Sequence, residues 1–205
     1  VGGNNHHAFF EFNDQWYIVY HAQTVAKALL GDGKGYRSPH INEVEFDEDG
    51  YIKEIIGNRT GIAQLKNLDP YKRNEAETIA WNKGITTEVS GAPGGFDANP
   101  DLNLNVTNIN DDHWIAVAGA DFGEEGATQF QANVASTVGG TMEIRLGTPG
   151  GKLVGTLQVT PTGGDQKWEL METEVDKIAG VHNVFFVFKG ENETNLFNFD
   201  YWQFK

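Results

Sequence analysis

The sequence contains no cysteine, and its 15 lysines and arginines are far outnumbered by 29 aspartates and glutamates. The lack of cysteine excludes disulfides, thiolate metal sites and a cysteine nucleophile. The formal charge of −14 opposes binding to nucleic acids and to anionic membrane surfaces, so neither is expected as a partner. No apolar run approaches the ~20 residues of a membrane span, and the start lacks a methionine and the pattern of a signal peptide. We therefore expect a mature or excised piece of a longer protein.

Aromatic and β-branched residues are frequent in the first 69 residues, where they flank short turns. A hairpin around residues 13–15 is predicted by FFEFNDQWYIVY, residues 9–20. A second hairpin, with its turn at residues 49–50, is predicted by HINEVEFDEDGYIKEI, residues 40–55. Between them, residues 24–38 indicate a short helical turn and a glycine-rich loop. Two hairpins amount to one four-stranded antiparallel sheet, which is marginal alone because both faces need covering.

A polar connector, Asn67 to Pro70, leads into a longer run of strand-length segments separated by glycine-rich turns. Many short strands with this spacing predict an all-β sandwich without helices, about 135 residues long. The segments are residues 113–122, 128–136, 141–147, 153–159, 167–175, 182–188 and 197–204. The sequence therefore predicts two domains, residues 1–69 and 70–205.

Both domains resemble known families. The first resembles the last blade of the five-bladed β-propeller of glycoside hydrolase family 43, as found in bacterial arabinoxylan arabinofuranohydrolases, in VGGNNHHAFFEFNDQWYIVYHAQ and GYRSPHINEVEFDEDGYI. The second resembles a carbohydrate-binding module of family 6, a jelly-roll β-sandwich, in EAETIAWNKGITTE, HWIAVAGADFG, GGTMEIRLGTPGGKLVGTL and LFNFDYWQF. The resemblance implies an all-β chain in which a terminal propeller blade is followed by a jelly-roll sandwich.

The resemblance also implies an enzyme that removes α-L-arabinofuranosyl branches from arabinoxylan by inverting hydrolysis. Its polymeric substrate implies that it is secreted. Inversion needs a general acid and a general base on opposite sides of the sugar, with room for water. In the family these carboxylates belong to earlier blades, whereas acids such as Glu11 and Glu43 match solvated strand and turn positions. This chain is thus expected to lack the catalytic carboxylates. Its expected partner is the set of missing N-terminal blades, either in the same protein or as a separate chain.

The resemblance assigns roles to His6 and Arg37 in the first domain. The motif NNHHA places His6 at the propeller axis, where it would help to hold a calcium ion or its water shell, with His7 on the opposite strand face. The alternative is a hydrogen-bonded histidine pair at the start of a strand. Arg37 would point into the sugar pocket, where a guanidinium binds carboxylates with two hydrogen bonds. The alternative is a surface-loop arginine.

Family 6 modules bind sugar at either of two places, the first of which is a cleft between loops. There Asn198 matches the asparagine that hydrogen-bonds the sugar. The two aromatic residues that sandwich the ring are missing, because Asn108 and Asp165 stand at their positions. A buried aromatic side chain contributes ~1.5 to 3 kcal/mol, so this loss argues against binding in the cleft.

The second place is the concave sheet face, where Trp114 and Glu143 match the family's tryptophan and glutamate. Binding a neutral polysaccharide needs such flat aromatic surface together with a few polar groups. The alternative for Trp114 is a tryptophan of the sandwich core, which is also the position expected for Trp81, Trp168 and Trp202.

A structural calcium ion is expected in the sandwich. Glu75 and Glu77 lie two residues apart on a predicted strand and so point the same way. Asp200 would come alongside them if the first and last strands pair, as in the family. Three carboxylates at one buried place repel one another without a cation. The alternative is three surface acids on edge strands.

Two rival functions are consistent with the same sequence. The first is a non-catalytic xylan-binding protein in which the sandwich carries a vestigial extension. The second is a purely structural module that binds no sugar, which the missing cleft aromatics would allow.

Overall fold

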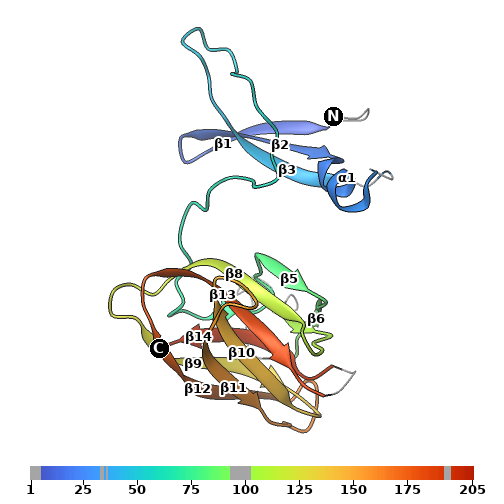
Figure 1. The fold of residues 1–205 in the computed structure, drawn as a ribbon, viewed down its shortest axis with the longest axis vertical. Coiled ribbons are helices and arrows are strands. Elements are labelled where there is room, and N and C mark those ends of the chain that lie inside the picture. The colour runs from blue at the N-terminus through green and yellow to red at the C-terminus, as the bar shows by residue number, and fades with distance from the viewer. Residues whose placement is uncertain (1–5, 33–34, 36, 93–102, 192–194) are drawn as a thin grey trace. The chain divides into compact units, whose positions relative to one another are not determined.

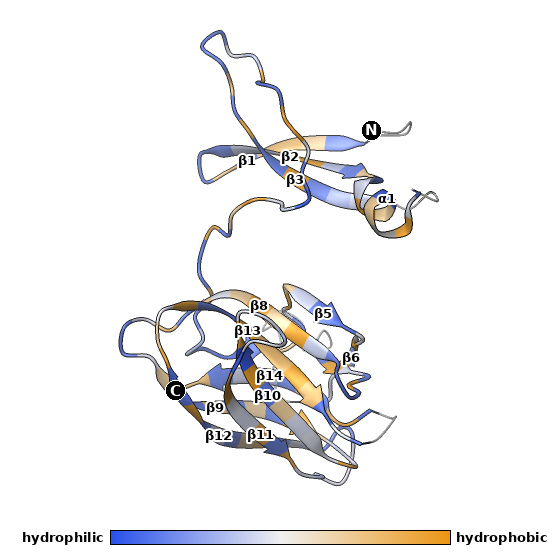
Figure 2. Cartoon of the chain, in the orientation of Figure 1, coloured by the Kyte–Doolittle hydropathy of each residue, from blue (hydrophilic) through white to orange (hydrophobic). Residues whose placement is uncertain are grey.

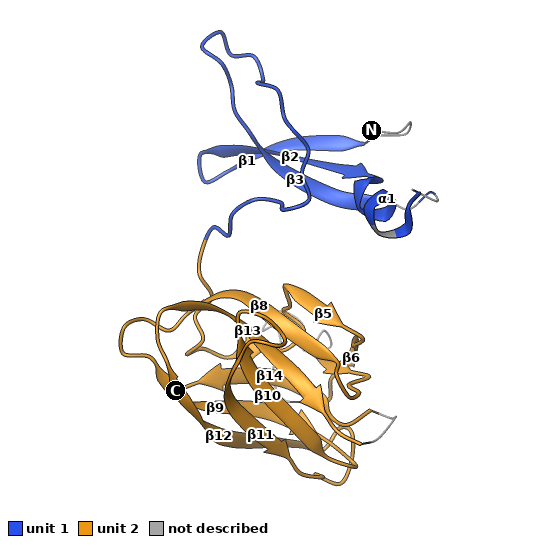
Figure 3. Cartoon of the chain, viewed as in Figure 1, with its two compact units in different colours: residues 1–65 blue, residues 66–205 orange. Residues whose placement is uncertain are grey.

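The computed structural model describes residues 6–32, 35, 37–92, 103–191 and 195–205. The chain divides into two compact units, Val1–Leu65 (unit 1) and Lys66–Lys205 (unit 2), which Figure 3 draws in blue and orange. The sequence indicated a boundary at residue 70. Among the described residues, no helix has the length and apolar character needed to cross a membrane.

Unit 1 is a three-stranded antiparallel sheet with one short helix (Figure 1). Its elements are β1 (His7–Phe12), β2 (Gln15–Ala22), α1 (Thr24–Leu30) and β3 (Ser38–Val44), with β2 in the middle of the sheet. The first predicted turn is confirmed, because Asn13 and Asp14 join β1 to β2 with φ angles of 51° and 59°. Positive φ at both positions is the geometry of a type I′ hairpin, which Asn and Asp tolerate.

The second predicted hairpin is only partly formed, so the expected four-stranded sheet is wrong for the described residues. Beyond β3 the two arms meet at an isolated bridge between Phe46 and Ile52. The Asp47 carboxylate holds the turn by accepting hydrogen bonds from the backbone N–H groups of Asp49 and Tyr51, at 3.1 and 2.8 Å. The returning arm stays outside the sheet because its apolar side chains find little to pack on: Tyr51 is 71% exposed and Ile52 47%.

Strand β1 is largely apolar (Figure 2) but exposed along its whole length. The side chains of Phe9, Phe10 and Phe12 are 40%, 39% and 51% exposed. Among the described residues of unit 1, the buried apolar ones are few: Tyr17, Ala22, Ala26 and Val44. Unit 1 therefore carries more apolar surface than it covers by itself.

Unit 2 is a two-layered β-sandwich that contains all seven predicted strands. Its strands are β4 (Asn74–Glu75), β5 (Trp81–Lys83), β6 (Thr86–Val89), β7 (Leu104–Thr107), β8 (Trp114–Asp121), β9 (Ala127–Ala135), β10 (Gly140–Leu146), β11 (Lys152–Val159), β12 (Trp168–Ile178), β13 (Val181–Lys189) and β14 (Asn198–Phe204). One layer has the order β5-β8-β13-β10-β11 and the other β12-β9-β14-β7-β6, with β4 paired to β14 (Figure 1). Strands β5, β6 and β7 were not predicted, because three or four residues are too few to show an alternating pattern.

The layers of unit 2 are joined where β11 pairs with β12, at Gly155 and Val175. A Cβ atom on Gly155 would lie 2.5 Å from Cγ1 of Val175, so the close approach requires glycine. Between the layers lies the main hydrophobic core. In it the ring of Phe186 lies 5.3 Å from the rings of both Phe130 and Trp202, between centroids. The prediction that Trp202 is a core residue is confirmed.

Candidate functional site

The face of the β5-β8-β13-β10 layer that points away from the core carries a row of aromatic and charged side chains. The antiparallel register pairs Lys83 with Trp114, Trp114 with Val187, and Val187 with Glu143. Residues directly opposite each other in neighbouring strands share one face of the sheet. The structure therefore brings Trp114 and Glu143 to the same sheet face.

A second row, two residues along the strands, adds further aromatic rings. Trp81 pairs with Ala116, and Ala116 pairs with Phe185. Ala116 and Phe185 belong to a small buried cluster separate from the main core, and Trp114 packs against it. Ring centroids lie 5.4 Å apart for Trp114 and Phe185, and 6.4 Å apart for Trp81 and Phe185, whose planes differ by 5°. Both tryptophans thus pack against the buried ring of Phe185, and their exposed parts supply the aromatic surface of this sheet face.

Two of the tryptophans expected in the core lie elsewhere. Trp81 is 47% exposed, because edge strand β5 turns its side chain to the same face as Trp114. Trp168 is partly exposed on β12 and donates its Nε1–H to Gln166 Oε1 at 3.3 Å. The core assignment is wrong for both. Trp114 is half-buried and packs outside the main core, so the sheet-face alternative describes it better.

Charged pairs border the aromatic surface. The Nε–H of Arg145 donates to Glu143 Oε2 at 2.9 Å, and its Nη1–H donates to the carbonyl of Gly151 at 2.9 Å. A hydrogen bond between Lys189 and Asp112 raises the pKa of Lys189 and lowers that of Asp112. A hollow of about 480 Å³ is lined by Lys83, Asp112, Trp114, Glu143, Arg145, Pro149, Gly150, Val187 and Lys189. An aromatic surface edged by hydrogen-bonding groups suits a sugar ring.

The loop cleft forms a second hollow, of about 610 Å³. Its described lining residues are Glu88, Val89, Ser90, Gly91, Thr107, Asp165, Gln166, Asn195 and Asn198, none of them aromatic. Asp165 thus borders the cleft. Asn108 does not belong to this lining, and its side-chain amide donates to the carbonyl of Gly84 at 2.9 Å.

Asn198 lies in this cleft, and the protein itself uses its amide donors. The Nδ2 group donates to Glu88 Oε1 at 2.7 Å and to the carbonyl of Asp165 at 2.8 Å, while Oδ1 accepts a hydrogen bond from Asn195 at 2.7 Å. An asparagine amide has two donor hydrogens, so none is left for a sugar hydroxyl. Glu88 on strand β6, which sequence reasoning missed, accepts one of these two hydrogen bonds, and the backbone carbonyl of Asp165 accepts the other.

The predicted carboxylate cluster lies where β4 pairs with β14, at Glu75 and Tyr201. The expected pairing of these strands is therefore present. Strand β4 ends at Glu75, so Glu77 lies beyond it and the argument from strand alternation is wrong for Glu77. Asp200, next to Tyr201, is completely buried rather than on the surface.

Four donors satisfy the Asp200 carboxylate. Oδ1 accepts from Ser90 Oγ–H at 3.0 Å and from Asn103 at 3.1 Å, and Oδ2 accepts from Asn133 at 3.1 Å and from Arg73 at 3.4 Å. Burial raises the pKa of Asp200, and these hydrogen bonds act in the opposite direction. The buried charge is thus compensated by polar groups of the protein.

Glu77 is less well satisfied. Its Oε2 is buried and lacks a hydrogen-bond partner among the described residues. Burial, with Glu75 and Asp200 nearby, raises the pKa of Glu77 to about 7. In this arrangement of the described residues, no three acidic or histidine side chains converge as metal ligands. The chemistry still fits calcium, which takes oxygen ligands: the carboxylates supply them, and so does Oδ1 of Asn103, which likewise has no hydrogen-bond partner among the residues described.

In unit 1, His6 precedes β1 and is exposed. Its backbone N–H donates to Nε2 of His21 at 3.1 Å, and the two rings meet at an angle of 69° with centroids 5.5 Å apart. The ring of His7 contacts Phe9 instead. Arg37 is exposed immediately before β3. The structure thus gives His6 a histidine partner from β2 that the sequence did not indicate.

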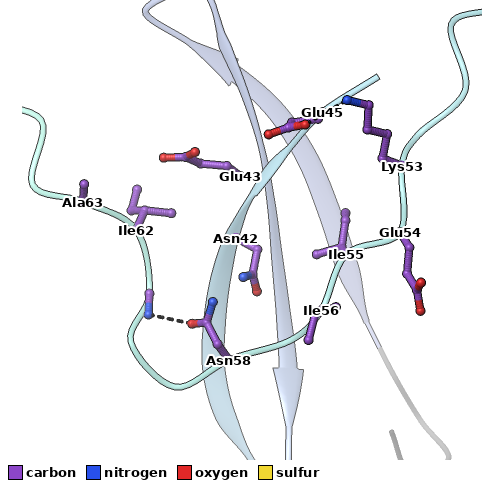
Figure 4. Close-up of a pocket in the computed structure, with 11 residues that line it drawn as sticks. Asn42, Glu43, Glu45, Lys53, Glu54, Ile55, Ile56, Asn58, Ile62 and Ala63 are labelled. Carbon is purple, nitrogen blue, oxygen red and sulfur yellow. Dashed lines mark hydrogen bonds and ion pairs between the residues drawn. The ribbon is translucent and has the colours of Figure 1, made fainter. Parts of the chain in front are cut away.

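A hollow of about 410 Å³ in unit 1 lies beside β3 (Figure 4). Glu43, Glu45 and Glu54 are among the residues that line it. Glu43 and Glu45 are exposed, and Glu45 pairs with Lys53 at 3.1 Å. These are the solvated positions expected for the acids of this region.

Comparison with known proteins defines the family. The profile of the carbohydrate binding module of family 6 matches residues 75–205, so the chain belongs to this family. It is 58% identical over 204 residues to an arabinoxylan arabinofuranohydrolase of Paenibacillus polymyxa. This alignment covers 100% of this chain and 32% of that protein. A solved glycoside hydrolase family 43 arabinoxylan arabinofuranohydrolase from Bacillus subtilis, in complex with cellotetraose, aligns with a TM-score of 0.90 and 58% identity over 100% of this chain and 41% of its own. A β-1,3-glucan binding family 6 module from Bacillus halodurans aligns with a TM-score of 0.63 and 35% identity, over 68% of this chain and 99% of its own.

These similarities confirm the predicted resemblance and the fold class. The chain is all-β, with a terminal propeller blade followed by a jelly-roll sandwich. It spans about a third of the length of the curated relatives, 32% and 38% for two of them.

Proposed function

We propose that the chain is the C-terminal portion of a secreted glycoside hydrolase that removes α-L-arabinofuranosyl branches from arabinoxylan by inverting hydrolysis. In this proposal unit 2 holds the polysaccharide on its sheet face. The observation that carries the binding role is the row of Lys83, Trp114, Val187 and Glu143, beside which Trp81 is 47% exposed. Aromatic rings stack on the apolar faces of sugars, while the neighbouring charged groups hydrogen-bond their hydroxyls.

The sheet face is favoured over the loop cleft because its aromatic rings are available. Trp81 and Trp114 present ring surface outside the core, whereas the amide donors of Asn198 are already used. Two similar proteins support an oligosaccharide ligand: the Bacillus subtilis enzyme was solved in complex with cellotetraose, and the Bacillus halodurans module binds β-1,3-glucan.

Catalysis would reside in blades that precede unit 1 in the full enzyme. The exposed β1 supports this, because Phe9 and Phe10 point to opposite faces of the sheet and each face needs a covering neighbour. His6 would lie at the propeller axis near a calcium ion, and Arg37 would reach the sugar pocket. The acid and base of inverting hydrolysis would come from the preceding blades.

A second calcium ion is proposed at the carboxylate cluster, with Glu75, Glu77 and Asp200 as ligand residues. Support comes from the buried oxygens of Glu77 and Asn103, which have no hydrogen-bond partner within the part of the chain that the structure describes. When bound, the ion would supply positive charge where β4 meets β14, the first and last strands of unit 2.

Native electrophoresis in gels that contain arabinoxylan, unsubstituted xylan or β-glucan tests the sheet face. We expect the 205-residue chain to be retarded and Trp114→Ala to lose most of that retardation. Trp168→Ala is the matched control, because it removes a partly exposed tryptophan from another strand. If Trp114→Ala keeps full retardation while Asn198→Ala loses it, the site lies in the loop cleft. If the wild-type chain shows no retardation, the module is structural.

The catalytic part is tested on the full-length protein by following the release of arabinose from arabinoxylan with NMR. Inversion predicts the β-anomer as the first product. Retention of configuration would contradict the mechanism. A full-length protein that binds xylan but releases no arabinose would leave the non-catalytic alternative.

A further inference from the structure

Arg73 lies within the carboxylate cluster of unit 2. Its Nε–H donates to Glu75 Oε1 at 2.6 Å, and its Nη2–H groups donate to Glu75 Oε2 at 3.0 Å and to Asp200 Oδ2 at 3.4 Å. Its guanidinium carbon lies 4.0 Å from the ring centroid of Tyr201, the residue that pairs with Glu75 in the sheet. One side chain therefore links acids from β4 and β14.

These contacts compensate the negative charge of the acids. The Asp200 side chain is 0% exposed and that of Glu75 is 23% exposed, and charges buried to this degree are costly unless they are paired and hydrogen-bonded. A guanidinium meets a carboxylate with two parallel hydrogen bonds and stays protonated across the whole working pH range. Arg73 thus provides positive charge where the sequence alone indicated only negative charge.

We propose that Arg73 is the resident cation of this cluster, and that a divalent cation binds there only after the guanidinium has left Glu75 and Asp200. The proposal builds on the calcium part of the proposed function and is independent of sugar binding. The two cations are alternative occupants of the same carboxylates. Arg73 therefore joins β4 to β14 in unit 2 without metal. Because calcium must first displace Arg73, the affinity of unit 2 for calcium is lowered.

Two buried oxygens show what a metal ion would gain. Glu77 Oε2 and Asn103 Oδ1 lack hydrogen-bond partners among the described residues, and the Nδ2 group of the same Asn103 already contacts Asp200 at 3.1 Å. Both atoms are oxygen acceptors of the type that calcium coordinates. Glu77 lies close enough to Glu75, Asp200 and Arg73 for their charges to act on its carboxyl group, so a calcium ion in the cluster would gain an oxygen that has no hydrogen-bond partner among the described residues.

Calorimetry of the 205-residue chain, in EDTA and in calcium, distinguishes the two occupants. Arg73→Met removes the charge and keeps an unbranched aliphatic side chain. Arg73→Lys keeps the charge but cannot form the two parallel hydrogen bonds of a guanidinium. In EDTA we expect the unit 2 transition of Arg73→Met to fall by about 5 °C or more, with Arg73→Lys between it and the wild type. Calcium should restore most of the loss, and titration calorimetry should show a calcium affinity about tenfold or more above that of the wild type. Magnesium, which gives up its waters reluctantly, is the control cation.

Equal transition temperatures for wild type and Arg73→Met in EDTA, or equal calcium affinities, would overturn the proposal. An Arg73→Met chain that is destabilised in EDTA and insensitive to calcium would overturn both the displacement and the calcium site. That result would not affect sugar binding, which the gel assay measures separately. If Arg73→Met fails to fold in EDTA, folding on addition of calcium supports the proposal, and Arg73→Lys then provides the comparison of affinities.

Discussion

Replacing Asn198 by alanine distinguishes a structural asparagine from a sugar ligand. The amide makes three hydrogen bonds, to Glu88, Asp165 and Asn195, at 2.7, 2.8 and 2.7 Å, and the residue is 1% exposed. A buried hydrogen bond contributes about 0.5–1.5 kcal/mol net, and one to a charged group about 1.5–3 kcal/mol. In the variant Glu88 stays hydrated and keeps its hydrogen bond from Gln166 at 3.2 Å, which limits the cost of leaving its carboxylate without Asn198. We therefore expect a loss of stability of about 2–4 kcal/mol.

Calorimetry on the 205-residue chain measures this loss. At about 3 °C per kcal/mol for a domain of this size, the transition of unit 2 should fall by roughly 6–12 °C. Asp165→Ala is the matched control, because Asp165 accepts the hydrogen bond with its backbone carbonyl, which the substitution keeps. The affinity of Asn198→Ala for oligosaccharides should stay within about twofold of the wild type. A fall of less than about 2 °C, with more than about tenfold loss of affinity, would refute the structural role.

Three further substitutions test the cluster, the core and the aromatic surface. The folded-state pKa of Glu77, about 7, lies above its ordinary value of 4.5, so its contribution to stability is complete below about pH 4.5 and is lost as the pH rises through 7. Glu77→Gln should flatten that decline in chemical unfolding with EDTA, and an unchanged slope would contradict the assignment. Phe186→Ala should cost about 3–5 kcal/mol in the same unfolding experiment, because its ring is fully buried in the main core, and a cost below about 1 kcal/mol would contradict that packing. Trp81→Ala should weaken the binding of long oligosaccharides by about tenfold in titration calorimetry and leave Tm nearly unchanged, whereas unaltered affinity would exclude Trp81 from the site.

The long strands of unit 2 could be predicted from the sequence because each is seven or more residues long and is bounded by glycine turns. Once β5 is known, the outward position of Trp81 follows from the sequence. Lys83 lies two residues further along the same strand and therefore on the same face, and a lysine indicates solvent. The partial loss of the second hairpin could not be predicted. The residues of its turn favour a hairpin, and what is missing is an apolar surface on which the returning arm could pack.

The state of Asn198 and of the carboxylate cluster depends on contacts between distant residues. Asn198 is bonded to Glu88, 110 positions away, and to Asp165, 33 positions away, so a match of position to a family could not show that its donors are occupied. The acids alone predict a metal ion, because carboxylates at one buried place repel one another. Arg73 stands two positions before Glu75 and just outside β4, so only its closeness in sequence could have indicated that it pairs with the acids.

The sheet face and the loop cleft together favour a ligand held along its length rather than by its end. The row from Lys83 to Glu143 crosses four strands, and three gaps of about 4.8 Å give a span of roughly 14 Å, which is longer than one sugar ring. Among its described residues the cleft has no aromatic ring, and the amide donors of Asn198 are occupied, so these residues offer no comparable clamp for a terminal ring. Affinity should therefore rise with chain length from the monosaccharide until the span is filled, and should not change when the reducing end is blocked. Titration calorimetry with a series of xylo- and cello-oligosaccharides measures both. Equal affinity for a monosaccharide and a hexasaccharide would show that a single ring carries the binding, and the sheet face would then not be the site.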